Sequence, residues 1–219
     1  MDDILLDIAS NKNKKNPDFL KKVSNTKLNC FGLYSKDLKI YCDKYRYYKF
    51  DESILNQYYE INFIYIYNGI RNLTNLLDQI SFIFSNYQYI DSWAITDSSY
   101  PLLKLPPQEE VIAVIKQLTS HQNSFVKRYG YLIMMKYKKE DISCFLPLFN
   151  NEEDYYVYMA EAWVLSELYI YHPEQIKTFI RESSLPYVCK SKTISKICDS
   201  YRVSKIAKQS LKQLRNTLK

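Results

Sequence analysis

Apolar side chains recur at intervals of three and four along most of the chain, which places them on one face of a helix. Residues 155–171 keep this spacing through Met159, Trp163 and Ile170. Residues 109–118 and 125–137 follow the same pattern. Residues 204–218 indicate a final basic helix, and the residues expected on its apolar side are Ile206, Leu211, Leu214 and Leu218.

Polar and proline residues separate these periodic segments. Asn123 or Ser124 is suited to cap the helix that follows it. Asn150 and Asn151 mark a break, and the three acids at 152–154 suit the start of the next helix. The dipeptide His172-Pro173 ends that helix, and Pro173 is suited to the first turn of another.

Residues 61–67 (INFIYIY) are the one ambiguous segment. Their Ile and Tyr content favours a strand, but they lie between helical patterns and have no strand partner. We therefore expect a buried helix here. The segment is also far too short to span a membrane, and we expect no membrane association.

Successive helices can be paired at a period of roughly 30–40 residues, the size of a HEAT-like helical hairpin. The sequence thus predicts an all-α fold, an α-α superhelix (solenoid) of HEAT-like repeats, with residues 1–219 forming a single domain. The expected pairs are 52–67 with 70–85, 88–97 with 108–119, 124–138 with 141–149, 154–171 with 173–182, and 187–198 with 204–218.

Composition narrows the alternatives. Three glycines and seven prolines in 219 residues are too few for the tight turns of a β-sandwich or barrel, and no glycine-rich phosphate loop is present. Five scattered cysteines without a C-x-x-C pair, and two histidines, argue against disulfides and against a zinc site. Because no apolar signal stretch begins the chain, we expect a reduced, cytoplasmic protein.

The net charge of +6 is unevenly distributed. Residues 11–49 and residues 187–219 each carry +8, whereas residues 50–186 carry −7. Two basic ends suit a polyanion such as nucleic acid, because neutralising phosphates releases counterions. Solvated lysines that only confer solubility explain the charge equally well.

Four side chains are candidates for chemistry: Trp93, Asp97, Arg128 and Trp163. A helix would place Trp93 and Asp97 on one face, four residues apart. Taken singly, each has an ordinary structural explanation, as a core tryptophan, a turn aspartate or a surface arginine. Spacing alone does not bring the four together.

Several stretches resemble the DNA alkylation repair family, the HEAT-like repeat alkylpurine DNA glycosylases of AlkD type. They are W-x-x-x-D at 93–97, VKRYG at 126–130, and YYV at 155–157 leading to Ala162-Trp163. The tail KTISK at 192–196 and DSYRV at 199–203 resembles a C-terminal motif of one branch. The resemblance extends from about residue 28 to the end.

The resemblance implies an enzyme that excises positively charged alkylated purines, such as 3-methyladenine and 7-methylguanine, from duplex DNA. By motif position, Asp97 is the catalytic carboxylate that stabilises the oxocarbenium-like sugar. Trp93 and Trp163 contact the cationic lesion and its deoxyribose through their indole faces, while Arg128 holds a backbone phosphate.

We expect further DNA contacts from Lys127, Lys192, Lys196 and Arg202. Because a cationic base is already a good leaving group, we expect neither metal nor organic cofactor. We also expect the protein to act as a monomer.

The N-terminal part departs from the family pattern. Residues 19–28 form only a short basic segment, and Val23 stands where an active homologue has Tyr. The chain is therefore also compatible with a catalytically inactive HEAT-like repeat paralogue that binds DNA or another partner without base excision. A peptide-binding scaffold is a third hypothesis, since repeat folds host many functions.

Overall fold

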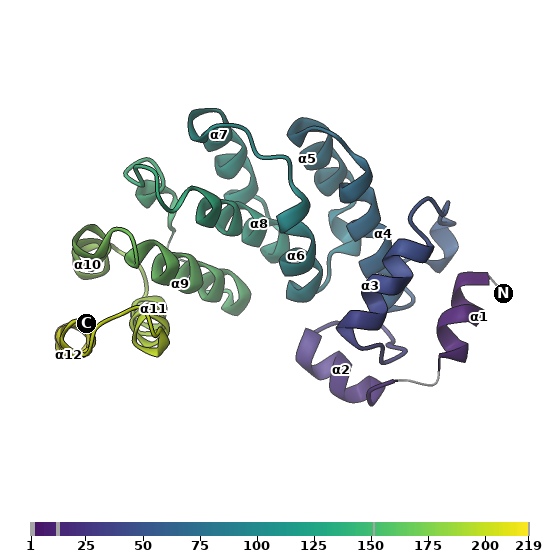
Figure 1. Cartoon of the computed structure of the whole chain (residues 1–219), viewed down its shortest axis with the longest axis horizontal. Helices are drawn as coiled ribbons and strands as arrows, with labels where there is room; N and C mark the ends of the chain where they lie inside the picture. Colours follow the sequence, from purple (N-terminus) through teal and green to yellow (C-terminus); the bar gives the residue numbers. More distant parts are fainter. Residues whose placement is uncertain (1–2, 12–13, 151, 219) are drawn as a thin grey trace. The chain divides into compact units, whose positions relative to one another are not determined.

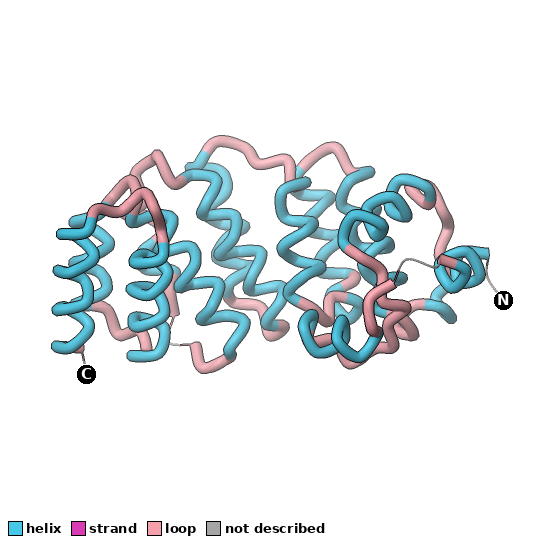
Figure 2. Tube along the Cα trace, turned by 60° about the horizontal axis from the view of Figure 1, so that its bottom comes forward, coloured by secondary structure: helices cyan, strands magenta, loops and turns pink. Residues whose placement is uncertain are grey.

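The computed structural model describes residues 3–11, 14–150 and 152–218, and their regular elements are helices, with no strand of a sheet (Figures 1 and 2). The prediction of an all-α protein is confirmed. The chain forms two compact units, residues 1–105 and 106–219, which are described separately.

The first unit contains six α-helices in its described residues. Helix α4 is its centre and packs against α3, α5 and α6. The predicted buried helix at 61–67 is confirmed as part of α4, where Ile61, Ile64 and Ile66 are fully buried. The helices are α1 (Asp3–Ser10), α2 (Pro17–Ser24), α3 (Ser35–Lys44), α4 (Tyr59–Asn72), α5 (Leu76–Ser85) and α6 (Trp93–Ser99).

A buried carboxylate fastens the loop before α3 to α4. Glu60 is completely buried, and it accepts hydrogen bonds from the backbone N–H groups of Phe31, Gly32 and Leu33 at 3.0, 2.8 and 3.3 Å. Gly32 has φ +90°, and a Cβ there would collide with the carbonyl oxygen of Lys15. The loop therefore depends both on a glycine and on an internal acid.

Helix α4 begins later than the pattern 52–67 predicts. Residues 52–54 form only a 3-10 turn, and Asn56 takes a left-handed φ of 60°. Asn56 and Asn62 exchange two hydrogen bonds of 2.9 Å, which hold the chain in this non-helical conformation before α4.

The second unit contains α7 to α12 (Figure 1), and these helices pack as the pairs α7/α8, α9/α10 and α11/α12. The last two pairs confirm the predicted hairpins. The helices are α7 (Gln108–Thr119), α8 (Ser124–Met134), α9 (Tyr155–Tyr169), α10 (Pro173–Glu182), α11 (Tyr187–Asp199) and α12 (Lys205–Thr217).

Helices α8, α9 and α11 run parallel to one another. The starts of α8 and α9 are joined by a 3.0 Å hydrogen bond from Arg128 Nη1 to the carbonyl of Tyr156. Beyond the C-terminal end of α8, Lys138 lies 3.2 Å from Glu167 of α9, and Arg202, just after α11, lies 2.6 Å from the same carboxylate. Glu167 thus joins the C-terminal ends of all three helices.

The predicted helix boundaries of this unit agree with its caps. The Asn123 side chain accepts from the N–H groups of Phe125 and Val126, and Asp154 caps α9 in the same way. Pro173 occupies the first turn of α10. Asn151, part of the predicted break before α9, lies outside the described residues.

In the second unit, two further predictions about helices were wrong. Residues 141–149 form no α-helix, and their only regular element is a 3-10 turn, Leu146–Leu148. The Asp141 side chain accepts from the Ser143 N–H in a turn, and Pro147 has no N–H to donate, so a longer run of helical hydrogen bonds does not form. Residues 124–138 therefore pair with α7 instead. Ile206, expected on the apolar side of α12, is 79% exposed, whereas Leu211 is buried.

The described residues include no helix long and apolar enough to cross a membrane. All five cysteines carry free thiols.

Candidate functional site

Helix α6 carries two of the four candidate residues. Ser92 caps the helix by accepting from the N–H of Ala94 at 3.2 Å, so that Trp93 is its first residue. Asp97 follows one turn later on the same face. Both side chains are half-buried, which means that neither belongs wholly to the core. The predicted pairing of an indole with a carboxylate on one helix face is thus present.

Three hydrogen bonds connect α6 and the two residues before it to the end of α2 and the residues that follow α2. Trp93 Nε1 donates to the carbonyl of Val23 at 3.0 Å, and Ser92 Oγ donates to the carbonyl of Ser24 at 2.6 Å. The Thr26 hydroxyl donates to Asp91. We call this set the α2–α6 link. It sets the orientation of the Trp93 ring, since the indole N–H has a fixed acceptor.

Asp91 is a carboxylate that the sequence reasoning missed. Burial raises its pKa, while the hydrogen bond from Thr26 lowers it. Asp91 accepts the Thr26 hydroxyl hydrogen bond of the α2–α6 link. No local sequence pattern predicts this contact, because Thr26 lies 65 positions earlier.

In the second unit the structure brings Arg128 and Trp163 together. The guanidinium carbon lies 6.0 Å from the centroid of the Trp163 ring, which is within range of a cation–π contact. Arg128 is only 6% exposed, and Nη1 donates to the Tyr156 carbonyl. Trp163 is half-buried. The expected phosphate contact of Arg128 stays a prediction, and it requires the phosphate to reach a largely buried group.

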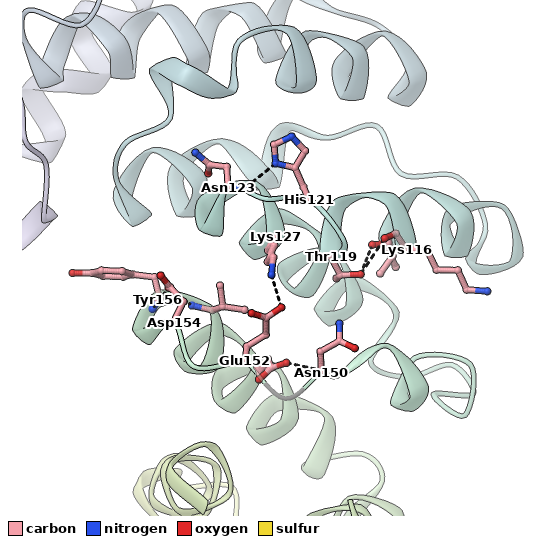
Figure 3. Close-up of polar contacts among 12 residues, drawn as sticks. Lys116, Thr119, His121, Asn123, Lys127, Asn150, Glu152, Asp154 and Tyr156 are labelled. Carbon is pink, nitrogen blue, oxygen red and sulfur yellow. Dashed lines mark hydrogen bonds and ion pairs between the residues drawn. The ribbon is translucent and has the colours of Figure 1, made fainter. Parts of the chain in front are cut away.

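Lys127 precedes Arg128 and forms an ion pair with Glu152 at 2.5 Å (Figure 3). Both side chains are 19% exposed, so the pair is well shielded from water. Burial lowers the pKa of the nearby His121, and the Lys127 charge lowers it further. As Figure 3 shows, the pair joins the start of α8 to the segment before α9. A protein carboxylate therefore already compensates the Lys127 charge.

The other three expected DNA contacts differ in their surroundings. Lys192 on α11 is exposed, and Lys196 is half-buried one turn later. Arg202 forms the ion pair with Glu167 described above. Of these residues, Lys192 has the environment most typical of a cation that contacts a phosphate.

Glu161, two positions before Trp163, is a second acid that the sequence reasoning missed. It is completely buried; Oε1 accepts from the Asn150 N–H at 3.1 Å, and the Cys189 thiol donates to Oε2 at 3.6 Å. Burial raises the pKa of Glu161 to about 7. The Glu161 carboxylate therefore attaches the segment before α9 to the α9 helix through its hydrogen bond from Asn150.

The raised pKa makes stability depend on pH. Between the ordinary value of 4.5 and about 7, the folded protein binds a proton that the unfolded chain has released, so stability falls as pH rises through this window. Above this pH window, the free energy of unfolding is lower by about 3 kcal/mol than below it. Glu161→Gln keeps an acceptor for Asn150 and removes the titration.

We therefore expect urea unfolding of Glu161→Gln to show a flatter pH dependence than that of the parent protein, and higher stability than the parent on the alkaline side. Groups common to both proteins cancel in the difference. Identical slopes for the two proteins across the window would show that Glu161 does not titrate there.

The structure thus places Trp93 with Asp97 on one helix, and Arg128 with Trp163 at another contact. The two pairs belong to different units. A shared cleft for all four stays a prediction. In the described part of the chain, no group of three or more His, Cys, Asp or Glu side chains is arranged to hold a metal ion.

Comparison with known proteins identifies the family. Residues 4–197 match the family described as DNA alkylation repair enzyme. The chain belongs to this family. A search of curated proteins found no match. Membership in the DNA alkylation repair enzyme family confirms the resemblance inferred from the sequence motifs, and it indicates an enzyme that acts in DNA repair with DNA as its substrate.

Proposed function

We propose that the protein is a monofunctional DNA glycosylase that hydrolyses the N-glycosidic bond of positively charged alkylated purines in duplex DNA. The observation that supports this most directly is the half-buried pair Trp93 and Asp97 on one helix, in a chain matched to the family over residues 4–197. 3-Methyladenine and 7-methylguanine are the expected lesions.

The residue types suit this reaction. An alkylated purine cation is a good leaving group without protonation, so the enzyme has only to stabilise the sugar cation that forms as the base departs. The Asp97 carboxylate supplies the opposite charge and orients the attacking water. The indoles of Trp93 and Trp163 favour a cationic base over a neutral one, by about 0.5–2 kcal/mol per contact. No cofactor takes part in this scheme.

The proposal includes a fold of HEAT-like repeats, supported by the antiparallel hairpins α9/α10 and α11/α12 and by the parallel helices α8, α9 and α11. We further propose that the protein is monomeric and cytoplasmic. In this scheme Arg128 contacts a phosphate beside the lesion.

The direct test is release of 7-methylguanine and 3-methyladenine from methylated duplex DNA, measured by chromatography of the free bases. We expect both bases to appear in proportion to enzyme and time. Unmethylated duplex DNA of the same sequence is the control. Absence of any released base, with the protein folded, would contradict the glycosylase proposal.

A second candidate function is a DNA-binding paralogue without excision activity. Its support is that Arg128 is 6% exposed and bound to a carbonyl, and that Glu152 compensates Lys127. It predicts salt-dependent duplex binding with no base release. The same chromatographic assay, run beside a binding measurement, separates the two candidates.

Lys192 and Lys127 are expected to contribute unequally to duplex binding. We expect Lys192→Gln to weaken binding severalfold at low salt and to reduce the slope of log K against log salt by about 0.9. Lys127→Gln should have a smaller effect, because Glu152 already pairs with this lysine. Fluorescence anisotropy over a salt series measures both. Equal losses for the two variants would contradict this assignment.

A further inference from the structure

A pocket lies in the first unit, and neither Trp93 nor Asp97 lines it. It has a volume of about 360 Å³, and it lies between the segment following α3 and the C-terminal half of α4. This size falls in the usual range for small-molecule sites. Among the residues that line it are Arg46, Tyr47, Lys49, Phe50, Tyr65 and Asn68.

The lining combines aromatic rings with cations. Phe50 packs against Tyr65 with ring centroids 5.4 Å apart, which builds an aromatic wall. Tyr47 is 77% exposed, and the Arg46 guanidinium lies 5.2 Å from its ring centroid. Lys49 is exposed. Exposed rings beside cations are typical of sites that stack a nucleobase and contact its phosphate.

Asn68 lines this pocket and fixes part of its wall. It is only 3% exposed, and its Nδ2 donates to the carbonyls of Cys42 and Tyr45 at 2.9 and 3.1 Å. These two bonds fix the amide orientation, since the oxygen could not make them. Oδ1 has no hydrogen-bond donor among the described residues. This oxygen is buried, so the part that Asn68 plays here is to hold the segment after α3 against α4 through its two donated hydrogen bonds.

The pocket is held in shape by the protein itself. Arg46 Nε donates to Asn72 Oδ1 at 2.9 Å, while Asn72 Nδ2 donates back to the Arg46 carbonyl at 2.8 Å. These reciprocal bonds attach the segment after α3 to the end of α4. The Tyr65 hydroxyl donates to Asn86 at 2.7 Å, which fixes its ring. The site is therefore preorganised for its ligand.

We infer that this pocket binds one unpaired nucleotide of single-stranded DNA. The base stacks on Tyr47 and the Phe50–Tyr65 wall, while Arg46 and Lys49 contact the phosphate. The inference goes beyond the proposed glycosylase function and does not depend on it, because the pocket contains neither Trp93 nor Asp97.

The test measures anisotropy of a labelled octamer of deoxyadenylate at low salt. Tyr47→Ala is the informative variant, because so exposed a side chain is removed without disturbing the core. We expect the parent protein to bind the octamer and Tyr47→Ala to lose about tenfold in affinity, the usual effect of one stacking contact. The matched control is Tyr171→Ala, an exposed tyrosine with Lys138 and Lys139 near its ring but outside this pocket.

Competition with unlabelled dAMP distinguishes a strand from a free nucleotide. If dAMP displaces the octamer only weakly, the ligand is a DNA strand. If the protein binds dAMP but not the octamer, the proposal of a single-stranded DNA ligand is wrong. If the parent protein does not bind the octamer, or if Tyr47→Ala and Tyr171→Ala lose the same affinity, the proposed nucleotide site in this pocket is wrong. Base release from methylated duplex, measured on the same Tyr47→Ala protein, is expected to be unchanged, so failure of this inference is distinct from failure of the glycosylase proposal.

Discussion

An Asp97→Asn protein is expected to release 7-methylguanine from methylated duplex DNA about 100- to 1000-fold more slowly than the parent protein. The amide has nearly the shape of the carboxylate but lacks its charge, so it stabilises the developing sugar cation far less. Duplex binding should change little, because a neutral side chain removes repulsion from phosphates and adds no clash. Single-turnover rates of base release, with enzyme in excess, measure the effect.

The matched control is Asp78→Asn on α5, an exposed aspartate of the same unit. Its rate of release should equal that of the parent. Normal release by Asp97→Asn would remove the carboxylate from the mechanism, whatever the family relationship.

Glu60→Ala is expected to destabilise the protein by about 3–5 kcal/mol. The completely buried carboxylate accepts from three successive N–H groups of residues 31–33, and alanine would leave all three without an acceptor. Its removal also creates a cavity beside α4. The free energy of unfolding from urea denaturation measures the loss.

Glu52→Ala is the comparison for that measurement, because Glu52 is an exposed acid of the same unit. It should change stability by less than about 0.5 kcal/mol. Glu60→Gln should fall between the two, since it keeps an acceptor oxygen but adds a donor that faces other donors. A loss below about 1 kcal/mol for Glu60→Ala would show that the loop finds other partners.

Much of the helical pattern was predictable because it depends on local chemistry. Asn123 and the acids before α9 mark helix starts in sequence as they do in structure, and Pro173 occupies the first turn it favours. The segment 61–67 required its neighbours for a decision, since its own composition favours a strand. Its burial in α4 shows that tertiary packing outweighs propensity here.

The incorrect predictions have causes that lie outside the periodic pattern. Residues 141–149 carry enough apolar positions to resemble a helix, but a side-chain turn at Asp141 and the proline at 147 interrupt it. Asn56 likewise exchanges bonds with Asn62 and delays α4. Ile206 has the correct spacing, yet it lies where nothing covers it among the described residues.

The candidate site was predictable only in part. Residue type and motif resemblance identified Trp93, Asp97, Arg128 and Trp163, and the structure joins them as two pairs. The acids Glu60, Asp91 and Glu161 gave no signal, because burial of a carboxylate depends on partners distant in the chain. The surroundings of Lys127 and Arg202 were equally hidden, since Glu152 and Glu167 are nowhere near them in sequence.

Two bonds of the α2–α6 link use main-chain acceptors of α2. The carbonyl oxygens of Val23 and Ser24 accept the hydrogen bonds from Trp93 Nε1 and Ser92 Oγ, respectively. Val23 itself is 47% exposed. Natural variation can therefore exchange the outward side chains of α2 without releasing the indole. Tyrosine, valine or a basic residue at position 23 would all preserve this hydrogen bond, so the side chain at this position can change without altering the orientation of the Trp93 ring.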